Sequence, residues 1–153
     1  MKFRENCKWA IVCPTSMGVR ITPVNRQPVH VSSLFEMQAT SAESNVLSIA
    51  AALGQPTKVL TAFVKGSPIA ALIKGDLRRR GISYEGPEVE KGDAWGYRHQ
   101  FNIADSGFGL RGPRVDNDRA GEVGRTLNVK DFDLHRLFVE EGVQVLHISG
   151  LIG

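Results

Sequence analysis

The chain has 153 residues, of which 42% are hydrophobic and 23% are charged, and its net charge is +3. These values are typical of one globular domain with a sizeable core, and they exclude an intrinsically disordered chain. The mild positive charge allows an anionic substrate but does not call for nucleic acid as a partner. Cys7 and Cys13 lack the spacing of a disulfide framework, and no apolar run reaches membrane-spanning length. The sequence therefore predicts a cytoplasmic protein without a membrane anchor.

The first part of the chain predicts one buried strand and two half-exposed strands. Trp9–Cys13 is a continuous apolar run, which is typical of a strand covered on both faces of a parallel sheet. Gly18–Pro23 and Pro28–Met37 alternate apolar and polar residues instead, as expected of strands with one solvated face.

A helix is predicted over Ala39–Gly54. Thr40 and Glu43 have the spacing of a capping box, and Gly54 favours the left-handed conformation that ends helices. The expected apolar face consists of Val46, Leu47, Ile49, Ala50 and Leu53. At a helix start, N–H groups and the positive dipole end favour polar or anionic ligands, although plain capping explains the same side chains. The polar side chains in question are Thr40, Ser41, Glu43, Ser44 and Asn45.

The middle of the chain predicts a second buried strand at Lys58–Val64, followed by a helix over Ser67–Arg80. Residues 82–119 are poor in aliphatic runs and rich in glycine, aromatic and charged residues. We expect them to form a small antiparallel sheet with two solvated faces, projecting from the main body. Its predicted strands are Glu85–Val89, Trp95–Ile103 and Arg114–Arg119.

The last part predicts a third core helix at Val129–Glu141, with Asp131 as a possible N-cap and with Leu134, Leu137 and Phe138 facing inward. Val143–Ser149 follows as a third buried strand. Alternating strands and helices of this kind indicate an α/β fold.

Few short motifs indicate chemistry. Gly107, Gly109 and Gly112 spell G-x-G-x-x-G, but no buried strand precedes them and no helix follows, which favours a mobile turn over a dinucleotide site. The histidines and cysteines show no metal-ligand spacing, so no metal site is predicted. Arg119, in D-R-A-G, is a candidate for bidentate binding of a carboxylate.

Several motifs occur in the order found in the amino-terminal half of the ribokinase-like (PfkB) carbohydrate kinases, and most resemble the 2-keto-3-deoxygluconate kinases. They are G-V-R-I-T-P (Gly18–Pro23), A-E-S-N-V (Ala42–Val46), A-A-A-L-G (Ala50–Gly54), L-R-R-R-G-I (Leu77–Ile82), W-G-Y-R (Trp95–Arg98), D-R-A-G (Asp118–Gly121), F-D (Phe132–Asp133) and L-H-I-S-G (Leu146–Gly150). The resemblance implies an α/β, ribokinase-like three-layer sandwich, present in part, with a small antiparallel β lid. Residues 1–153 would be the amino-terminal part of a single domain, with lid strands at about 18–37 and 82–119.

The resemblance also implies a substrate site. Ser41 and Asn45 match positions that contact sugar hydroxyls, Tyr97 matches a lid tyrosine, and Arg119 matches the arginine that binds the carboxylate of sugar acids. The chain departs from the family at several positions. Thr40–Ser41 replace a Gly-Gly pair, Val19 stands where Glu or Asp is common, Asn117 replaces a tyrosine, and Glu122–Val123 follow D-R-A-G in place of Ser-Ala.

In this family the phosphate-binding G-A-G-D stretch, the general-base aspartate and the nucleotide pocket belong to the carboxy-terminal half, and no such stretch occurs before Gly153. We therefore expect the substrate-recognition half of an ATP-dependent sugar or sugar-acid kinase, inactive alone, without catalytic or metal-binding residues. ATP and Mg²⁺ are expected for the complete enzyme only. The alternative is a non-catalytic sugar-binding or oligomerisation module, because the lids of this family often form dimers. Neither interpretation involves nucleic acid or a membrane.

Overall fold

The main body is built on a parallel sheet. A computed structural model describes residues 4–150, and in it the strands of this sheet follow the order β10-β1-β4-β6. Each neighbouring pair runs parallel. The strands are β1 (Trp9–Pro14), β4 (Thr57–Leu60), β6 (Ile82–Glu85) and β10 (Val143–Leu146). The buried strand predicted at the start of the chain is confirmed, and it lies at the centre of the sheet.

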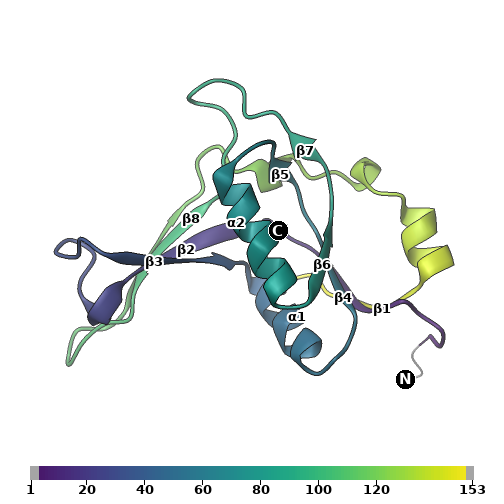
Figure 1. Cartoon of the computed structure of the whole chain (residues 1–153), viewed down its shortest axis with the longest axis horizontal. Coiled ribbons are helices and arrows are strands. Elements are labelled where there is room, and N and C mark those ends of the chain that lie inside the picture. Colours follow the sequence, from purple (N-terminus) through teal and green to yellow (C-terminus); the bar gives the residue numbers. More distant parts are fainter. Residues whose placement is uncertain (1–3, 151–153) are drawn as a thin grey trace.

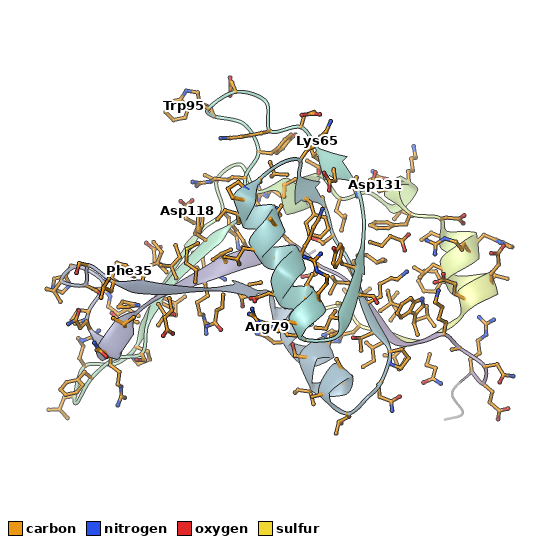
Figure 2. All side chains as sticks on the ribbon, in the orientation of Figure 1. Phe35, Lys65, Arg79, Trp95, Asp118 and Asp131 are labelled. Carbon is orange, nitrogen blue, oxygen red and sulfur yellow. The ribbon has the colours of Figure 1, made fainter. Side chains whose placement is uncertain are left out.

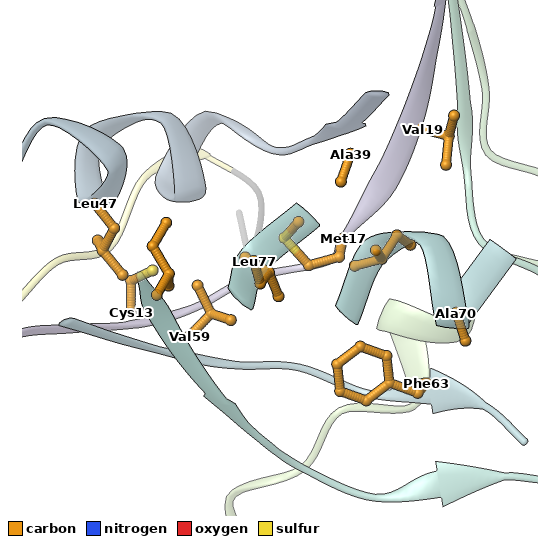
Figure 3. Packing of buried hydrophobic residues seen from close by; sticks show 11 residues of the cluster. Cys13, Met17, Val19, Ala39, Leu47, Val59, Phe63, Ala70 and Leu77 are labelled. Carbon is orange, nitrogen blue, oxygen red and sulfur yellow. The ribbon is translucent and has the colours of Figure 1, made fainter. Parts of the chain in front are cut away.

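Apolar side chains cover both faces of this sheet. One cluster packs the sheet against the two helices and includes Cys13, Leu47, Ile73 and Leu77. Figure 3 shows these buried side chains from close by, with Phe63 at one end of the cluster and Leu47 near the other. A second cluster on Trp9, Val12, Leu60 and Leu137 packs against the last turns of the chain. Burial on both faces explains why β1 reads as an unbroken apolar run.

The first helix, α1 (Ala42–Ala52), starts later and is capped differently from the prediction. Ser41 is the N-cap, and it forms a reciprocal capping box with Ser44 rather than one between Thr40 and Glu43. Thr40 is instead the last residue of β3, so its backbone is already used in a sheet. The predicted apolar face is largely wrong, because Leu47 is buried whereas Ile49 and Leu53 are exposed.

The second helix, α2 (Pro68–Arg79), agrees closely with its prediction. Ser67 caps it through its side-chain oxygen, and Pro68 occupies the first turn, where a missing N–H costs nothing. Asp76 is buried on this helix and accepts a 2.6 Å hydrogen bond from the backbone N–H of Ala39. Arg80 donates to the carbonyl of the same Ala39. This pair of bonds fixes the end of β3, just before α1, to the second helix.

A second sheet projects from the main body (Figure 1), in the order β3-β2-β8-β9. Its strands are β2 (Gly18–Pro23), β3 (Phe35–Thr40), β8 (Phe101–Asp105) and β9 (Arg114–Asp118). The sheet is mixed rather than purely antiparallel, because β2 and β8 run parallel. β3 starts later than predicted, since residues 28–31 form a turn closed by the Val31 N–H and the Pro28 carbonyl. The short 3₁₀ turn η1 (Val24–Arg26) also lies in the β2–β3 connection.

The glycine motif forms the turn that was predicted for it. Gly107 has a left-handed φ of 70°, and Phe108 pairs with Arg111 across the loop that joins β8 to β9. A helix does not follow, which agrees with the interpretation against a dinucleotide site.

Two predicted strands are interrupted. Lys58–Val64 is divided into β4 and β5 (Phe63–Val64), and β5 pairs with β7 (Glu88–Val89) rather than with the main sheet. The interruption faces Gly86 and Pro87, and proline has no N–H to donate to the neighbouring strand. On the partner side, residues 82–85 join the main parallel sheet as β6 instead of the projecting sheet.

The predicted helix at Val129–Glu141 is two short segments. The 3₁₀ turn η3 (Val129–Asp131) is capped by Asn128, and the π-helix η4 (Arg136–Glu141) follows after extended backbone at Phe132. Asp133 accepts from the N–H of Arg136 and so begins the second segment. The remaining 3₁₀ turn is η2 (Val123–Thr126). Within residues 4–150, every helix is too short or too polar to cross a lipid bilayer.

Candidate functional site

Three of the four predicted site residues line one cavity. The cavity has a volume of about 400 Å³ and lies between the start of α1 and the projecting sheet. Ser41 and Asn45 reach it from the first turns of α1, and Arg119 reaches it from just beyond β9. These residues are far apart in the chain, and the fold brings them to one cavity.

The projecting sheet supplies further polar residues to the same cavity. Arg20 of β2 lies directly beside Asn102 of β8 in the strand register. Gln100 is two residues before Asn102, which places both amides on one face of the strand. All three side chains line the cavity together with the predicted residues.

Two amide oxygens in this wall have no hydrogen-bond partner among the described residues. They are Oε1 of Gln100 and Oδ1 of Asn102, and both are buried. Gln100 is only 2% exposed, and its Nε2 donates to the carbonyl of Ser16 at 3.2 Å, which fixes the orientation of the amide. An unsatisfied buried acceptor costs about 1–3 kcal/mol, and both oxygens are turned away from the open part of the cavity.

The charges at the cavity are mostly positive. Among residues 4–150, neither Arg20 nor Arg119 forms an ion pair, and both are exposed. The acidic residue of the lining is Glu43, which is 1% exposed. Its carboxylate accepts a 2.7 Å hydrogen bond from Thr15 and a second from Ser149. Glu43 is therefore already engaged, whereas the two guanidinium groups are not.

Thr15 and Ser16, between β1 and β2, connect the two sides of the cavity. Thr15 binds Glu43 in the first turn of α1, and Ser16 binds the buried carboxylate of Glu122, three residues after Arg119. Glu43 also acts on the core behind it. Burial, followed by the negative charge of Glu43, raises the pKa of the Cys13 thiol to about 12.

Tyr97 lies elsewhere. It lines a second cavity of about 340 Å³ with Lys91, Arg98 and the start of α2. Figure 2 shows the exposed Trp95 on the loop between β7 and β8, two residues before Tyr97. His99 lies at the back of this second cavity. Its Nε2 accepts from the Val64 N–H and its Nδ1 donates to the Met17 carbonyl, so the ring is neutral. Burial lowers the pKa of the His99 ring below its ordinary value.

Comparison with solved structures identifies the architecture. The chain is similar to a 2-dehydro-3-deoxygluconokinase from Thermotoga maritima, with a TM-score of 0.78 over 91% of this chain and 21% identity. A PfkB family carbohydrate kinase from Listeria grayi gives a TM-score of 0.78 over 92% of this chain, at 25% identity. A putative 2-keto-3-deoxygluconate kinase from Enterococcus faecalis gives 0.71 over 86%, at 23% identity. The chain has the fold of the PfkB carbohydrate kinases.

The PfkB fold is present in part. This chain spans 40% of the length of the Thermotoga protein, 42% of the Listeria protein and 37% of the Enterococcus protein. A scan against protein-family models and a search of curated proteins gave no match. The likeness to PfkB kinases is thus carried by the fold and by the sequence motifs, which agree with each other.

Within residues 4–150, no three histidine, cysteine or acidic side chains are grouped so that they could hold a metal ion.

Sequence reasoning missed half of the cavity wall. Arg20, Gln100 and Asn102 were not singled out, although each stands at a polar position in an alternating strand. The alternation in H-Q-F-N-I indicates that Gln100 and Asn102 share a face. The sequence does not indicate that this face of the strand lies opposite the start of α1.

Proposed function

We propose that this chain is the sugar-recognition part of an ATP-dependent sugar or sugar-acid kinase, with Ser41, Asn45 and Arg119 in contact with the substrate. The observation that carries the proposal is the polar cavity that these three residues line together with Arg20, Gln100 and Asn102. Sugar hydroxyls are donors as well as acceptors, so they complement such a wall. The PfkB-type fold supports the same class of substrate.

Ser41, Asn45 and Arg119 would each contact a different part of the sugar. Ser41 is partly committed to capping α1, so it presents a fixed hydroxyl oxygen to the cavity, while the exposed amide of Asn45 can both donate and accept. Arg119 has no acidic partner among the described residues, and a guanidinium binds a carboxylate through two parallel hydrogen bonds. Tyr97 lines the other cavity, so these three residues carry the proposal.

Phosphoryl transfer from ATP would depend on residues outside this chain. The kinases of this fold are more than twice as long as the part of them that this chain matches. The proposed role of this segment is therefore to bind the acceptor sugar. On this proposal the chain alone phosphorylates no sugar.

The test is a direct binding measurement. Titration calorimetry of the purified chain with 2-keto-3-deoxygluconate should give saturable binding, and Asn45→Ala should weaken it by about tenfold through loss of hydrogen bonds. Gln55→Ala is the matched control, because Gln55 is exposed just after α1 and does not line the cavity. Equal affinity of the two variants would place the binding elsewhere.

A non-catalytic oligomerisation module is the second candidate. It is favoured by exposed apolar side chains on the β2–β3 part of the lid, where Val31 is 61% exposed, Leu34 66% and Met37 44%. Apolar surface gathered on one projecting element is characteristic of a contact with another protein. On this proposal two lids pack together to form a homo-oligomer.

A further inference from the structure

The connection between the two sheets is buried along its whole length. Residues 15–17 join β1 of the main sheet to β2 of the projecting sheet, and Thr15, Ser16 and Met17 are each at most 3% exposed. Connections between strands usually run over the surface, where water satisfies their polar groups. In this protein the polar groups of the connection need partners from the protein itself.

The Thr15 hydroxyl binds the wall of the cavity that α1 forms. It donates at 2.7 Å to the carboxylate of Glu43, which lies between Ser41 and Asn45 in the first turns of the helix. Ser149 donates to the same carboxylate. Glu43 is 1% exposed and belongs to none of the ion pairs among residues 4–150, so these hydroxyl donors offset the cost of burying its charge. Thr15 therefore fixes the start of α1 to the end of β1.

The next residue, Ser16, binds the opposite wall of the cavity. Its hydroxyl donates to the buried carboxylate of Glu122, which follows Arg119 by three residues after the end of β9. Its carbonyl accepts a 3.2 Å hydrogen bond from Nε2 of Gln100, just before β8. Two consecutive residues of one buried segment thus hold the two walls, one residue for each wall.

This segment is packed without spare room. A β-carbon at Gly18 would overlap the side chain of Gln100, and a β-carbon at Gly124 would overlap the side chain of Ser16. A shift of the β8–β9 side of the projecting sheet against β1 would therefore break the hydrogen bonds of Ser16 or force close-packed atoms together. The other edge of the sheet is held separately, by Asp76 of α2 at the end of β3.

We propose that Thr15 and Ser16 are positioning residues that hold the two walls of the cavity at a fixed separation. Both act through other residues, because neither of them lines the cavity. A ligand that contacts both walls then finds them already ordered, and preorganisation of this kind strengthens binding. The effect on sugar binding rests on the proposed function, whereas the separation of the walls is a property of the protein without ligand.

Distances between two spin labels measure this separation directly. Ile49→Cys on α1 and Val115→Cys on β9 carry the labels, since both side chains are exposed and neither lines the cavity. Cys7→Ser removes the partly exposed native thiol, and Cys13 is buried. Dilution with unlabelled protein removes distances between copies. Pulsed electron paramagnetic resonance should give one narrow distance distribution, and Ser16→Ala should broaden it.

Thr15 allows a second test with a conservative variant. Thr15→Val keeps the shape and removes the hydroxyl, whereas Thr15→Ser keeps the hydroxyl. Glu43 retains Ser149 as a donor, so Thr15→Val should fold even if Ser16→Ala does not. Thr15→Val should broaden the label distribution and weaken calorimetric binding of 2-keto-3-deoxygluconate about tenfold, and Thr15→Ser should restore both. Ser48→Ala is the matched control, because the Ser48 hydroxyl binds a carbonyl within α1.

Circular dichroism melts show which variants are folded. An unchanged label distribution in the folded variants Ser16→Ala and Thr15→Val would overturn this inference and leave the proposed function standing. Broadening that Thr15→Ser does not reverse, or that Ser48→Ala also produces, would overturn it as well. If the unsubstituted chain binds no sugar acid while the label distances change as expected, the proposed function is wrong and the positioning role of Thr15 and Ser16 stands.

Discussion

Arg119 shows how a single charged residue can separate two classes of substrate. Its guanidinium lines the cavity without an acidic partner among residues 4–150. It can therefore bind an anion without first breaking an existing ion pair. A charge-assisted pair with a carboxylate contributes about 1.5–3 kcal/mol. A neutral sugar offers no such partner, and for it the same side chain is only one hydrogen-bond donor among several.

Arg119→Lys should therefore weaken sugar-acid binding by about tenfold and leave neutral sugars almost unaffected. Lysine keeps the charge but cannot make two parallel hydrogen bonds to one carboxylate. Calorimetry with D-gluconate and D-glucose on both proteins measures the two losses. Equal losses for acid and neutral sugar would mean that Arg119 holds the lid in shape, beside Asp116 and Asp118, rather than binding the carboxylate.

The two cysteines should differ sharply in reactivity. Burial and the charge of Glu43 raise the pKa of Cys13 to about 12, so almost none of this thiol is ionised at neutral pH. Cys7 is partly exposed. Titration with Ellman's reagent at pH 7.5 should modify one thiol in the folded protein and a second only after unfolding in guanidinium chloride. Rapid modification of both thiols in the folded protein would contradict the burial of Cys13.

For single residues, the sequence predicts which side chains belong to a site better than it predicts which side chains lie next to them. The motifs around Ser41, Asn45 and Arg119 drew attention to these residues, and they do share a cavity. Tyr97 was drawn in by the same reasoning, yet it lies in a separate cavity, since the turn closed by Tyr97 N–H and the Lys91 carbonyl keeps it short of β8. Pairing between β2 and β8 is long-range, so nothing local in the sequence announces that Arg20 stands beside Asn102.

Among the elements, the π-helix η4 shows how charge can hold a short segment in place. Glu141, at its end, accepts hydrogen bonds from the indole of Trp9 and the ammonium of Lys8. These donors lower the pKa of the Glu141 carboxyl from 4.5 to about 2. Arg136 at the other end of the segment binds Glu141 and Glu85. The last helix is thereby attached to β1, although it is only six residues long.

Glu141→Gln should lower the free energy of unfolding by about 1–3 kcal/mol at pH 7, because it removes hydrogen bonds to a charged group. The sign of the pH dependence follows from the lowered pKa. The contribution of Glu141 is complete above about pH 4.5 and is lost as the pH falls toward 2. Urea unfolding at several pH values measures it. The two proteins should converge in stability near pH 2, and a constant difference at all pH values would show that the loss is one of packing.

Elements with local signals were predicted best. Ser67, Pro68 and the apolar spacing up to Leu77 defined α2 nearly to the residue. The segment 129–141 has the same kind of spacing, but extended backbone at Phe132 divides it. α1 exposes Ile49 and Leu53, because the opposite side of the helix, with Leu47 and the buried Glu43 that binds Thr15, faces the sheet. Periodicity alone does not fix that orientation.

On the scale of the whole molecule, residues 4–150 leave two surfaces uncovered. One is the free edge of β10, with Leu146 47% exposed and Ile148 59% exposed beside it. The other is the lid, with Val31 and Leu34 at its β2–β3 end. An uncovered sheet edge and an apolar projection both favour association.

The protein should therefore form dimers or larger species at micromolar concentration. Sedimentation velocity over a concentration series measures the association, and Val31→Ser with Leu34→Ser should shift it toward monomer if the lids are in contact. Leu146→Ser is the matched variant for the β10 edge. A single monomeric species across the series would contradict this prediction.

The α/β architecture was predicted from the sequence because strands and helices alternate and because the motifs occur in family order. The placement of residues 82–85 was not, since the same short segment suits a projecting sheet or the edge of the main sheet. Residues 82–85 belong to the main sheet because they pair with β4. This pairing is set by the packing of α2, which connects to β6 in the chain.

The central claim is that the cavity at the start of α1 binds a sugar or sugar acid, and nuclear magnetic resonance tests it most directly. The ¹⁵N-labelled protein is titrated with D-gluconate and, separately, with 2-keto-3-deoxygluconate. The account predicts that the side-chain amide signals of Asn45, Gln100 and Asn102 shift together with one dissociation constant, while those of Gln55 and Asn128 stay in place. Shifts confined to the cavity around Tyr97, or no shifts with either sugar acid, would contradict it.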